Sequence, residues 1–336
     1  MTRPIRIGAW RQKTLREIGV RALFFCGSDP DLNRALTPIS ASYRRWGVAL
    51  AIAGTLVFSF RPILVKLVYV TYPVSPVTLL FLRMSISLPF FLAVAWWLRR
   101  DEPRLTARDW IYVAALGCTG YYAASFLDFL GLQYVGAGVG RLILYLYPTL
   151  VLLISFLFLH RRPTRRQLTA LVITYAGVAL ILSSQAHGGT EGKLFILGAM
   201  LVFASSLFYA TYLVAGGELV KRIGSMRFTA YSMALATVPA VAQFFVIEPM
   251  SALELPTLVW IYAILLATFT TVLPLFIQAE ALKRIGAPEF ALIGALGPVS
   301  VAITSALGLD ERFTAVQALG GLLVIFGVLL VSVKRS

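Results

Sequence analysis

The stretch from Gly136 to Arg162 reads GAGVGRLILYLYPTLVLLISFLFLHRR, and it decides the fold class. Its apolar part is about 24 residues long with one charge, Arg141, and a helix needs roughly 20 apolar residues to cross a bilayer. Basic residues follow directly, as they often do at the cytoplasmic end of a membrane helix. The stretch therefore predicts a membrane-spanning helix that ends at a cytoplasmic loop.

A second copy of this stretch runs from Gly286 to Arg312 and reads GAPEFALIGALGPVSVAITSALGLDER. The offset is 150 residues, the difference between positions 136 and 286, and it needs no gap back to Trp110 or forward to Val178. The identical pairs include Gly136 and Gly286, Ala137 and Ala287, Pro148 and Pro298, Ser155 and Ser305, Arg162 and Arg312, Thr164 and Thr314, and Gln167 and Gln317. Apolar composition alone does not align Pro, Gln and Arg. We infer two copies of one hydrophobic unit, a pattern typical of membrane transporters.

The composition of the whole chain is that of a membrane protein. Hydrophobic residues make up 59% of the 336 residues and charged residues 13%, with a mean hydropathy of +0.82. Soluble domains are near 45–50% apolar and about 25% charged. We read the net charge of +15 as basic loops beside the lipid bilayer, so no nucleic-acid partner is expected. Cys26 and Cys118 predict neither a disulfide nor a metal site.

Ten apolar segments follow a basic tail at residues 1–46, which has no long apolar run and no secretory signal pattern. The segments are 47–70, 76–98, 110–133, 136–159, 167–185, 194–215, 227–247, 258–282, 288–309 and 315–333. The loops between them are short. No soluble domain large enough to fold alone is expected.

Loop charge predicts the orientation of these segments. Most Lys and Arg residues lie in the tail and in alternate loops, including 99–109 and 160–166, whereas the loop 185–193 and its counterparts hold only Lys193 and Arg312 beside the acids Glu191, Glu248, Glu254, Asp310 and Glu311. By the positive-inside rule both termini are cytoplasmic, in the plasma (inner) membrane. Five helices per repeat is an odd number, so the second repeat enters the membrane upside down. The predicted fold is an all-α integral membrane protein with ten transmembrane helices in two inverted five-helix repeats, 47–186 and 194–334.

With this arrangement the chain resembles the EamA family of the drug/metabolite transporter superfamily. The matching stretches are YLYPTLVLLISFLFLHRRPTRRQL and ALGPVSVAITSALGLDERFTAVQALGGLLVIFGVLLVS, with FSFRPILVK similar to the family's first helix and PVTLLFLRMS to its second. The resemblance covers about 46–336 and implies two five-helix repeats and membrane transport. His160, Arg161 and Arg162 replace the commoner Gly-Glu-Arg turn. The resemblance does not select a substrate, because relatives move amino acids, nucleotide-related compounds, sugars and drugs.

Polar residues that share helical faces at matching positions of both repeats indicate a substrate path. On this basis the first, third, fourth, sixth, eighth and ninth helices are expected to line a central cavity. The predicted substrate-binding residues are Ser59, Tyr121, Ser125, Asp128, Arg141, Tyr145, Tyr209, Tyr212, Thr271 and Gln278. Plainer alternatives stay open, because Ser and Thr often bond to helix backbone and Tyr often anchors a helix at the interface.

Charges inside the predicted helices are the sharper signal, because they are costly in a membrane. They are Arg61, Lys66, Arg83, Arg141 and Asp128, although Lys66 and Arg83 could also snorkel outward. Asp128 and Arg141 lie at similar depth on either side of the short turn near Gln133, so we expect them to form an ion pair. The excess of basic groups favours an anionic or a zwitterionic substrate. Glu280 is expected to pair with a basic residue one turn away.

These observations favour a secondary transporter, expected to export a small polar or amphipathic metabolite by alternating access of two inverted repeats. No cofactor is expected, and the chain lacks a GxxxxGK[ST] motif for nucleotide binding. Transport is either facilitated diffusion or coupled to protons, with Asp128 the leading titratable group. The alternatives are an integral-membrane enzyme or a non-transporting lipid-handling scaffold. An enzyme is disfavoured, because the only histidines, His160 and His187, lie on opposite sides of the predicted topology.

Overall fold

A computed structural model describes residues 41–98, 105–159, 164–183, 189–294, 296–308 and 314–332. Every regular element in these ranges is helical. The first half contains α3 (Ala41–Thr71), α4 (Pro76–Trp97), α5 (Ala107–Gly117), α6 (Ala124–Gly131), α7 (Ala137–Leu144), α8 (Tyr147–Leu159) and α9 (Arg165–Ser183). The second half contains α10 (Gly189–Ile223), α11 (Ser225–Ile247), α12 (Thr257–Ala267), α13 (Leu273–Gly294), α14 (Leu296–Gly308) and α15 (Ala315–Ser332). The predicted tail lies outside the described residues as far as position 40.

The described residues include eight helical stretches that are long and apolar enough to cross a membrane. They match the first eight predicted segments, and the last two correspond to shorter apolar helices, Leu296–Ala306 and Ala315–Leu330. The prediction of an all-helical, multi-pass membrane protein is therefore confirmed. Length and composition do not establish the count of ten crossings.

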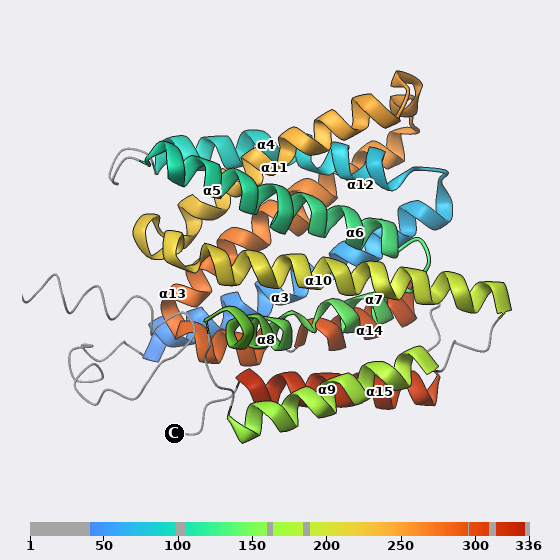
Figure 1. The fold of residues 1–336 in the computed structure, drawn as a ribbon. Coiled ribbons are helices and arrows are strands. Elements are labelled where there is room, and N and C mark those ends of the chain that lie inside the picture. Colours follow the sequence, from blue (N-terminus) through green and yellow to red (C-terminus); the bar gives the residue numbers. More distant parts are fainter. Residues whose placement is uncertain are drawn as a thin grey trace, which may run out of the picture.

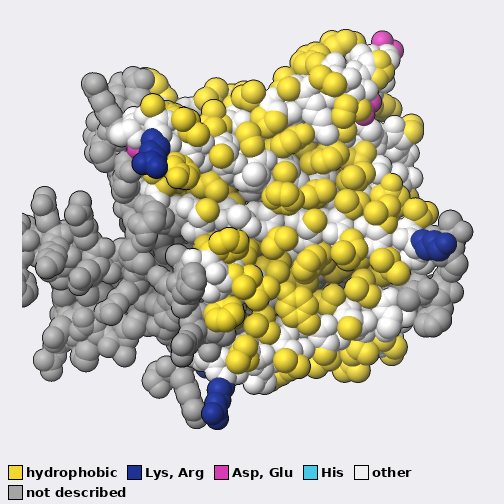
Figure 2. Space-filling view, in the orientation of Figure 1, with side chains coloured by type: hydrophobic (Ala, Val, Ile, Leu, Met, Phe, Trp, Pro, Cys, Tyr) yellow, Lys and Arg dark blue, Asp and Glu magenta, His cyan; other side chains and the backbone are white. Residues whose placement is uncertain are grey.

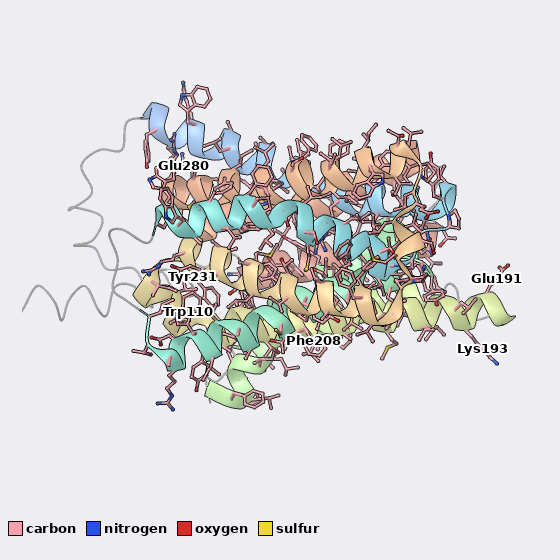
Figure 3. The ribbon with its side chains drawn as sticks, turned by 90° about the horizontal axis from the view of Figure 1, so that it is seen from above. Trp110, Glu191, Lys193, Phe208, Tyr231 and Glu280 are labelled. Atoms are coloured by element: carbon pink, nitrogen blue, oxygen red, sulfur yellow. The ribbon has the colours of Figure 1, made fainter. Side chains whose placement is uncertain are left out.

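The helices run along one common direction, and the charged side chains on the visible surface lie at the two ends of the bundle. In Figure 1, α3 begins and α15 ends at the same end of the bundle. Figure 2 shows a mainly hydrophobic face between ends where the visible Lys and Arg side chains lie. Figure 3 shows Trp110, Tyr231 and Glu280 at one end, and Glu191 and Lys193 at the other. An apolar middle with charged ends is the surface that a bilayer requires.

Helix pairing follows the sequence repeat. α9 packs against α15 (Figure 1), and α4 packs against α11, so equivalent helices of the two repeats meet. α3 packs against α13, and α10 packs in the matching way against α6 and α7. The most extensive helix contacts are thus retained when the two repeats are exchanged, whereas the contact between α7 and α14 has no such counterpart.

Glycine allows the α9–α15 pair to approach closely, and it does so at repeat-equivalent places. A Cβ on Gly177 would lie 2.5 Å from the carbonyl oxygen of Gly320. A Cβ on Gly327, 150 residues after Gly177, would lie 2.9 Å from the carbonyl oxygen of Ala170. Small residues let helix backbones pack without a side chain between them, which is how membrane helices associate without a hydrophobic driving force.

The third helix of each repeat contains a π-helical turn where we expected continuous α-helix. The turns are Cys118–Ala123, between α5 and α6, and Thr268–Val272, between α12 and α13. Just after the second turn, Pro274 has no N–H, so it cannot donate to the Thr270 carbonyl four residues earlier. Within the turn, the Thr271 hydroxyl donates to the Leu266 carbonyl oxygen at 2.7 Å. Such turns re-aim the side chains that follow them.

The predicted helix 136–159 is two helices, because the backbone turns at Tyr145 and Leu146 between α7 and α8. Pro148 cannot donate to the Leu144 carbonyl, so the regular ladder cannot continue through this point. Leu146 N donates instead to Ile143 O at 3.0 Å, a tighter three-residue turn.

Three boundaries also differ from the sequence prediction. α3 and α10 extend beyond the predicted segments 47–70 and 194–215. α13 continues to Gly294, through the break expected at 283–287. The expected pairing of Glu280 is confirmed: Arg284 Nε lies 2.8 Å from its Oε1, and this pair one turn apart supports the continuous helix.

Candidate functional site

The centre of the candidate site is an ion pair between α3 and α6. Arg61 Nη2 donates to Asp128 Oδ2 at 3.0 Å, and only 14% of the Arg61 side chain and 8% of the Asp128 side chain are exposed. Arg61 lies ten residues before the end of α3, which places it roughly 15 Å along the helix from that end. A charge within a membrane helix costs about 2.5–3.5 kcal/mol on insertion scales, and pairing offsets part of this cost.

The expected ion pair between Asp128 and Arg141 is therefore wrong in its partner. The argument from equal depth assumed that α6 and α7, joined by a short turn, present these two side chains to each other. Instead, α6 packs mainly on α10, and α7 packs mainly on α14 and α10. The Arg141 guanidinium lies over the ring of Phe58, with Cζ 4.5 Å from the ring centroid.

Arg141, Arg61 and Arg83 are linked by two phenylalanine rings. Phe58 is contacted by Arg141 and also by Arg61, whose Cζ lies 5.8 Å from its centroid. Phe129 is contacted by Arg61 at 5.5 Å and by Arg83 at 5.0 Å. The aromatic faces attract the cations, while Arg61 remains within electrostatic range of both Arg83 and Arg141.

Arg83 is the most deeply buried member of this arginine cluster, which we define as Arg61, Arg83 and Arg141. It is 2% exposed, and its Nε and Nη2 have no hydrogen-bond partner. The possibility that Arg83 snorkels to the surface is excluded by this burial. The Nε atoms of Arg61 and Arg141 are likewise buried without a partner.

A chain of tyrosines extends from the arginine cluster. The ring of Tyr147 lies 5.2 Å from that of Tyr209, and Tyr209 is 6.2 Å from Tyr212. Tyr121 packs 4.9 Å from Tyr212, and Tyr145 packs 6.0 Å from Tyr147. The structure thus brings together four of the predicted residues, Tyr121, Tyr145, Tyr209 and Tyr212.

Electrostatics tie the tyrosine chain to the arginine cluster. Tyr121 lies within electrostatic range of Arg61 and Arg83, and Tyr209 within range of Arg61 and Arg141. Side chains on α3, α6 and α7 and on α10 therefore form one continuous region.

The other predicted residues mainly join helices. The Ser59 hydroxyl bonds to the Thr55 carbonyl of its own helix at 2.8 Å, and it accepts from Ser300 Oγ at 2.8 Å. Gln278 Nε2 donates to Gly54 O at 3.3 Å, across α3 and α13.

The last two predicted positions are also within the protein. Thr271 donates to the Leu266 carbonyl of α12, just before its own π-helical turn. Ser125 is buried on α6, next to Ala124, whose carbonyl accepts from Ser205 Oγ at 2.6 Å.

Lys66 serves the turn after α6 rather than the arginine cluster. Its Nζ donates to the carbonyl oxygens of Leu132 at 3.0 Å and Val135 at 3.1 Å. These carbonyls belong to the end of α6 and the following turn, where a cation offsets the helix dipole.

Sequence reasoning omitted four members of this region from the site: Arg61, Arg83, Phe58 and Phe129. The two arginines stand out in the sequence as charges within membrane helices. Their positions in the chain give no sign that they contact the same phenylalanine ring. The phenylalanines had no signal, because an aromatic residue in an apolar helix is ordinary until a cation is seen on its face. Tyr147 was also missed, because the turn before Pro148 brings it to the side of Tyr145.

Comparisons with known proteins agree with this architecture. The EamA-like transporter family matches the chain twice, at residues 45–183 and 196–333. The uncharacterized transporter YcbK of Bacillus subtilis is 29% identical over 284 residues, covering 82% of this chain and 88% of that protein. The uncharacterized transporter YyaM of the same organism is 28% identical over 236 residues, covering 70% of this chain and 76% of that protein.

The fold is also found in a solved structure. The crystal structure of another protein superposes with a TM-score of 0.60 at 16% identity, covering 86% of this chain and 97% of that one. At this identity the likeness concerns the fold alone. The two matches to the EamA-like transporter family together cover most of the chain, and they confirm the resemblance inferred from its motifs. The chain belongs to the EamA-like transporter family, within the drug/metabolite transporter superfamily.

Proposed function

We propose that this protein is a secondary transporter that exports a small polar or amphipathic metabolite by alternating access of two inverted five-helix repeats. The observation that carries the proposal is the Arg61–Asp128 pair, which lies between membrane-spanning helices of a protein in a transporter family. Buried charges of this kind mark substrate or ion pathways, because packing alone gives no reason to retain them.

The helix contacts support the inverted-repeat part of the proposal. Exchange of the repeats maps α3–α13 onto α10–α6 and α10–α7, and it leaves α9–α15 and α4–α11 unchanged. A transporter built this way can open to either side by moving one repeat-related bundle against the other. The proposed repeats are residues 47–186 and 194–334, preceded by a cytoplasmic tail at 1–46.

The proposed transport path lies between α3, α6, α7 and α10, where the arginine cluster and the tyrosine chain meet. Basic residues in alternate loops support cytoplasmic termini in the plasma membrane. Asp128 is the proposed titratable group if transport is coupled to protons, and facilitated diffusion remains the alternative.

Metabolite profiling of intact cells tests this function. Cells that express the protein should show a raised ratio of external to internal concentration for at least one small metabolite, relative to cells without it. The double variant Arg61→Gln with Asp128→Asn should lose this change, and because it neutralises both members of the pair, neither is left charged without its partner. Glu191→Gln removes an exposed acid in the first turn of α10 and is the matched control. This variant should retain the raised concentration ratio. Identical profiles in cells with and without the wild-type protein would refute the proposal.

A further inference from the structure

Two of the three guanidinium groups in the arginine cluster form no ion pair with a carboxylate of the described residues, although Asp128, which pairs with Arg61, lies within electrostatic range of both. Arg61 is satisfied by Asp128 at 3.0 Å. Arg83 is 2% exposed, with Nε and Nη2 unpartnered, and Arg141 has a buried, unpartnered Nε. Three cations therefore face one anion within the membrane-spanning helices.

The other acids with described side chains are engaged or exposed elsewhere. Asp109 caps α5 by accepting from Thr106 N at 2.9 Å, and Glu280 pairs with Arg284. Glu248, at the end of α11, accepts from the Ser75 hydroxyl. Glu191 and Glu254 are exposed. None of these carboxylates neutralises Arg83 or Arg141.

Cation–π contacts hold the two guanidiniums that lack an ion pair. Arg83 lies over Phe129 and Arg141 over Phe58, with Cζ 5.0 Å and 4.5 Å from the respective centroids. A cation–π contact does not use the N–H groups of the guanidinium as hydrogen-bond donors to oxygen, so it leaves them for other partners. Those N–H groups form the fork that binds a carboxylate or a phosphate in bidentate geometry.

We propose, building on the transport function above, that the substrate is an organic anion whose oxyanion headgroup binds to Arg83 and Arg141. A zwitterion would also need a carboxylate to receive its ammonium group, and Asp128 is already held by Arg61. The described cluster therefore favours the anionic over the zwitterionic alternative. Asp128 acts as a positioning residue, because it holds Arg61 between the two phenylalanine rings.

Ligand-dependent thermal stability of the purified protein tests the headgroup. The probes are benzoate, phenyl phosphate and the neutral benzamide, which share one ring and differ in the headgroup. We expect benzoate or phenyl phosphate to raise the melting temperature in a saturable way, and benzamide to leave it unchanged. A response to benzoate identifies a carboxylate site, and a response to phenyl phosphate alone identifies a phosphate site. An equal response to benzamide, or no response to either anion, would overturn the proposal.

Variants locate the effect. Arg83→Gln and Arg141→Gln should each raise the anion concentration for the half-maximal shift by about tenfold or more, as loss of a charge-assisted pair of hydrogen bonds requires. Arg83→Lys should recover only part of the affinity, because an ammonium lacks the planar fork. Arg165→Gln, the same change at an exposed position on α9, is the control and should bind like the wild type.

The ligand-free melting temperature separates binding from folding. Removing an unpaired buried charge should leave it unchanged or higher, whereas a structural role for Arg83 predicts a clear fall. If Arg83→Gln does not fold, Arg141→Gln alone decides.

The profiling experiment separates this proposal from the transport function. Export of neutral or cationic metabolites alone would refute the anion site while leaving transport intact. Anion binding without any exported metabolite would refute transport while leaving the site intact.

Discussion

The two repeats of this chain share their scaffold and differ in their charges. Both have a π-helical turn in the third helix and a capping Thr–Gln pair before the last helix. The first repeat alone carries the arginine cluster and Asp128. Positions 150 residues later hold Thr211, Met233, Ala291 and Gln278 in place of Arg61, Arg83, Arg141 and Asp128.

This difference separates what the fold needs from what the site needs. Packing and backbone geometry recur in both repeats, because each repeat must form the same five-helix unit in the same lipid environment. The charges do not recur, so the unit folds without them. We infer that they are retained for a ligand, and that the proposed site belongs mainly to the first repeat.

The largest expected effect concerns orientation, because labelling is all or none. Arg104 and Glu254 are equivalent loop positions, 150 residues apart, and inverted repeats place them on opposite sides of the membrane. In a background without Cys26 and Cys118, an impermeant thiol reagent added to intact cells should label Glu254→Cys and not Arg104→Cys. Labelling of both positions would break the inverted relation, whereas labelling of Arg104→Cys alone would reverse the predicted orientation of the chain.

The next largest effect compares Asp128 with its equivalent, Gln278. Asp128→Asn leaves the Arg61 charge buried and unpaired, so it should lower stability by about 3–5 kcal/mol. Gln278→Ala removes one hydrogen bond to Gly54 and should cost about 0.5–1.5 kcal/mol. Unfolding of purified protein in mixed micelles measures both. Adding Arg61→Gln to Asp128→Asn should recover most of the loss. Equal effects of the two single variants would contradict the asymmetry.

A smaller and symmetric effect is expected at the α9–α15 contact. Gly177→Ala would place a Cβ 2.5 Å from the Gly320 carbonyl oxygen, and Gly327→Ala would collide with Thr174 Oγ1. Overpacking of this kind costs about 1–3 kcal/mol, and the two variants should be similar. Thermal unfolding measures this cost. Gly224→Ala is unsuitable as a control, because Gly224 has a φ of 78°, a conformation that disfavours any residue with a Cβ. A loss confined to one repeat would show that the scaffold is less symmetric than its contacts.

The smallest effect is at the helix caps. Thr164 Oγ1 accepts from Gln167 N at 3.3 Å, and Thr314 Oγ1 accepts from Gln317 N at 3.2 Å. Thr164→Ala and Thr314→Ala should each cost about 1 kcal/mol, the usual value for a lost N-cap. Thr→Ser at either position keeps the hydroxyl and should cost less. Thermal unfolding of the four variants in parallel checks this, and Ser variants as unstable as the Ala variants would exclude a capping role.

The outcome for the candidate site shows how far the pattern of polar residues reaches. It singled out Tyr121, Asp128, Arg141 and Tyr209, which the structure places in one region, because a polar residue in a membrane helix stands out against an apolar background. It also singled out Ser59, Thr271 and Gln278, whose hydroxyl and amide groups bond to backbone carbonyls in the structure. It missed Phe58 and Phe129, whose role depends on cations from other helices.

The sequence by itself determined the membrane class, the two repeats and the family, because these follow from hydrophobic length and from identities at a constant offset. It also located the charged residues within the membrane helices, which stand out because a charge is costly in the bilayer. Only the tertiary structure decided which of these charges meet. Asp128 pairs with Arg61 and not with Arg141, since the partner depends on the rotation of α3, α6 and α7 about their axes. That rotation is set by packing against α10, α13 and α14, which lie far away in sequence.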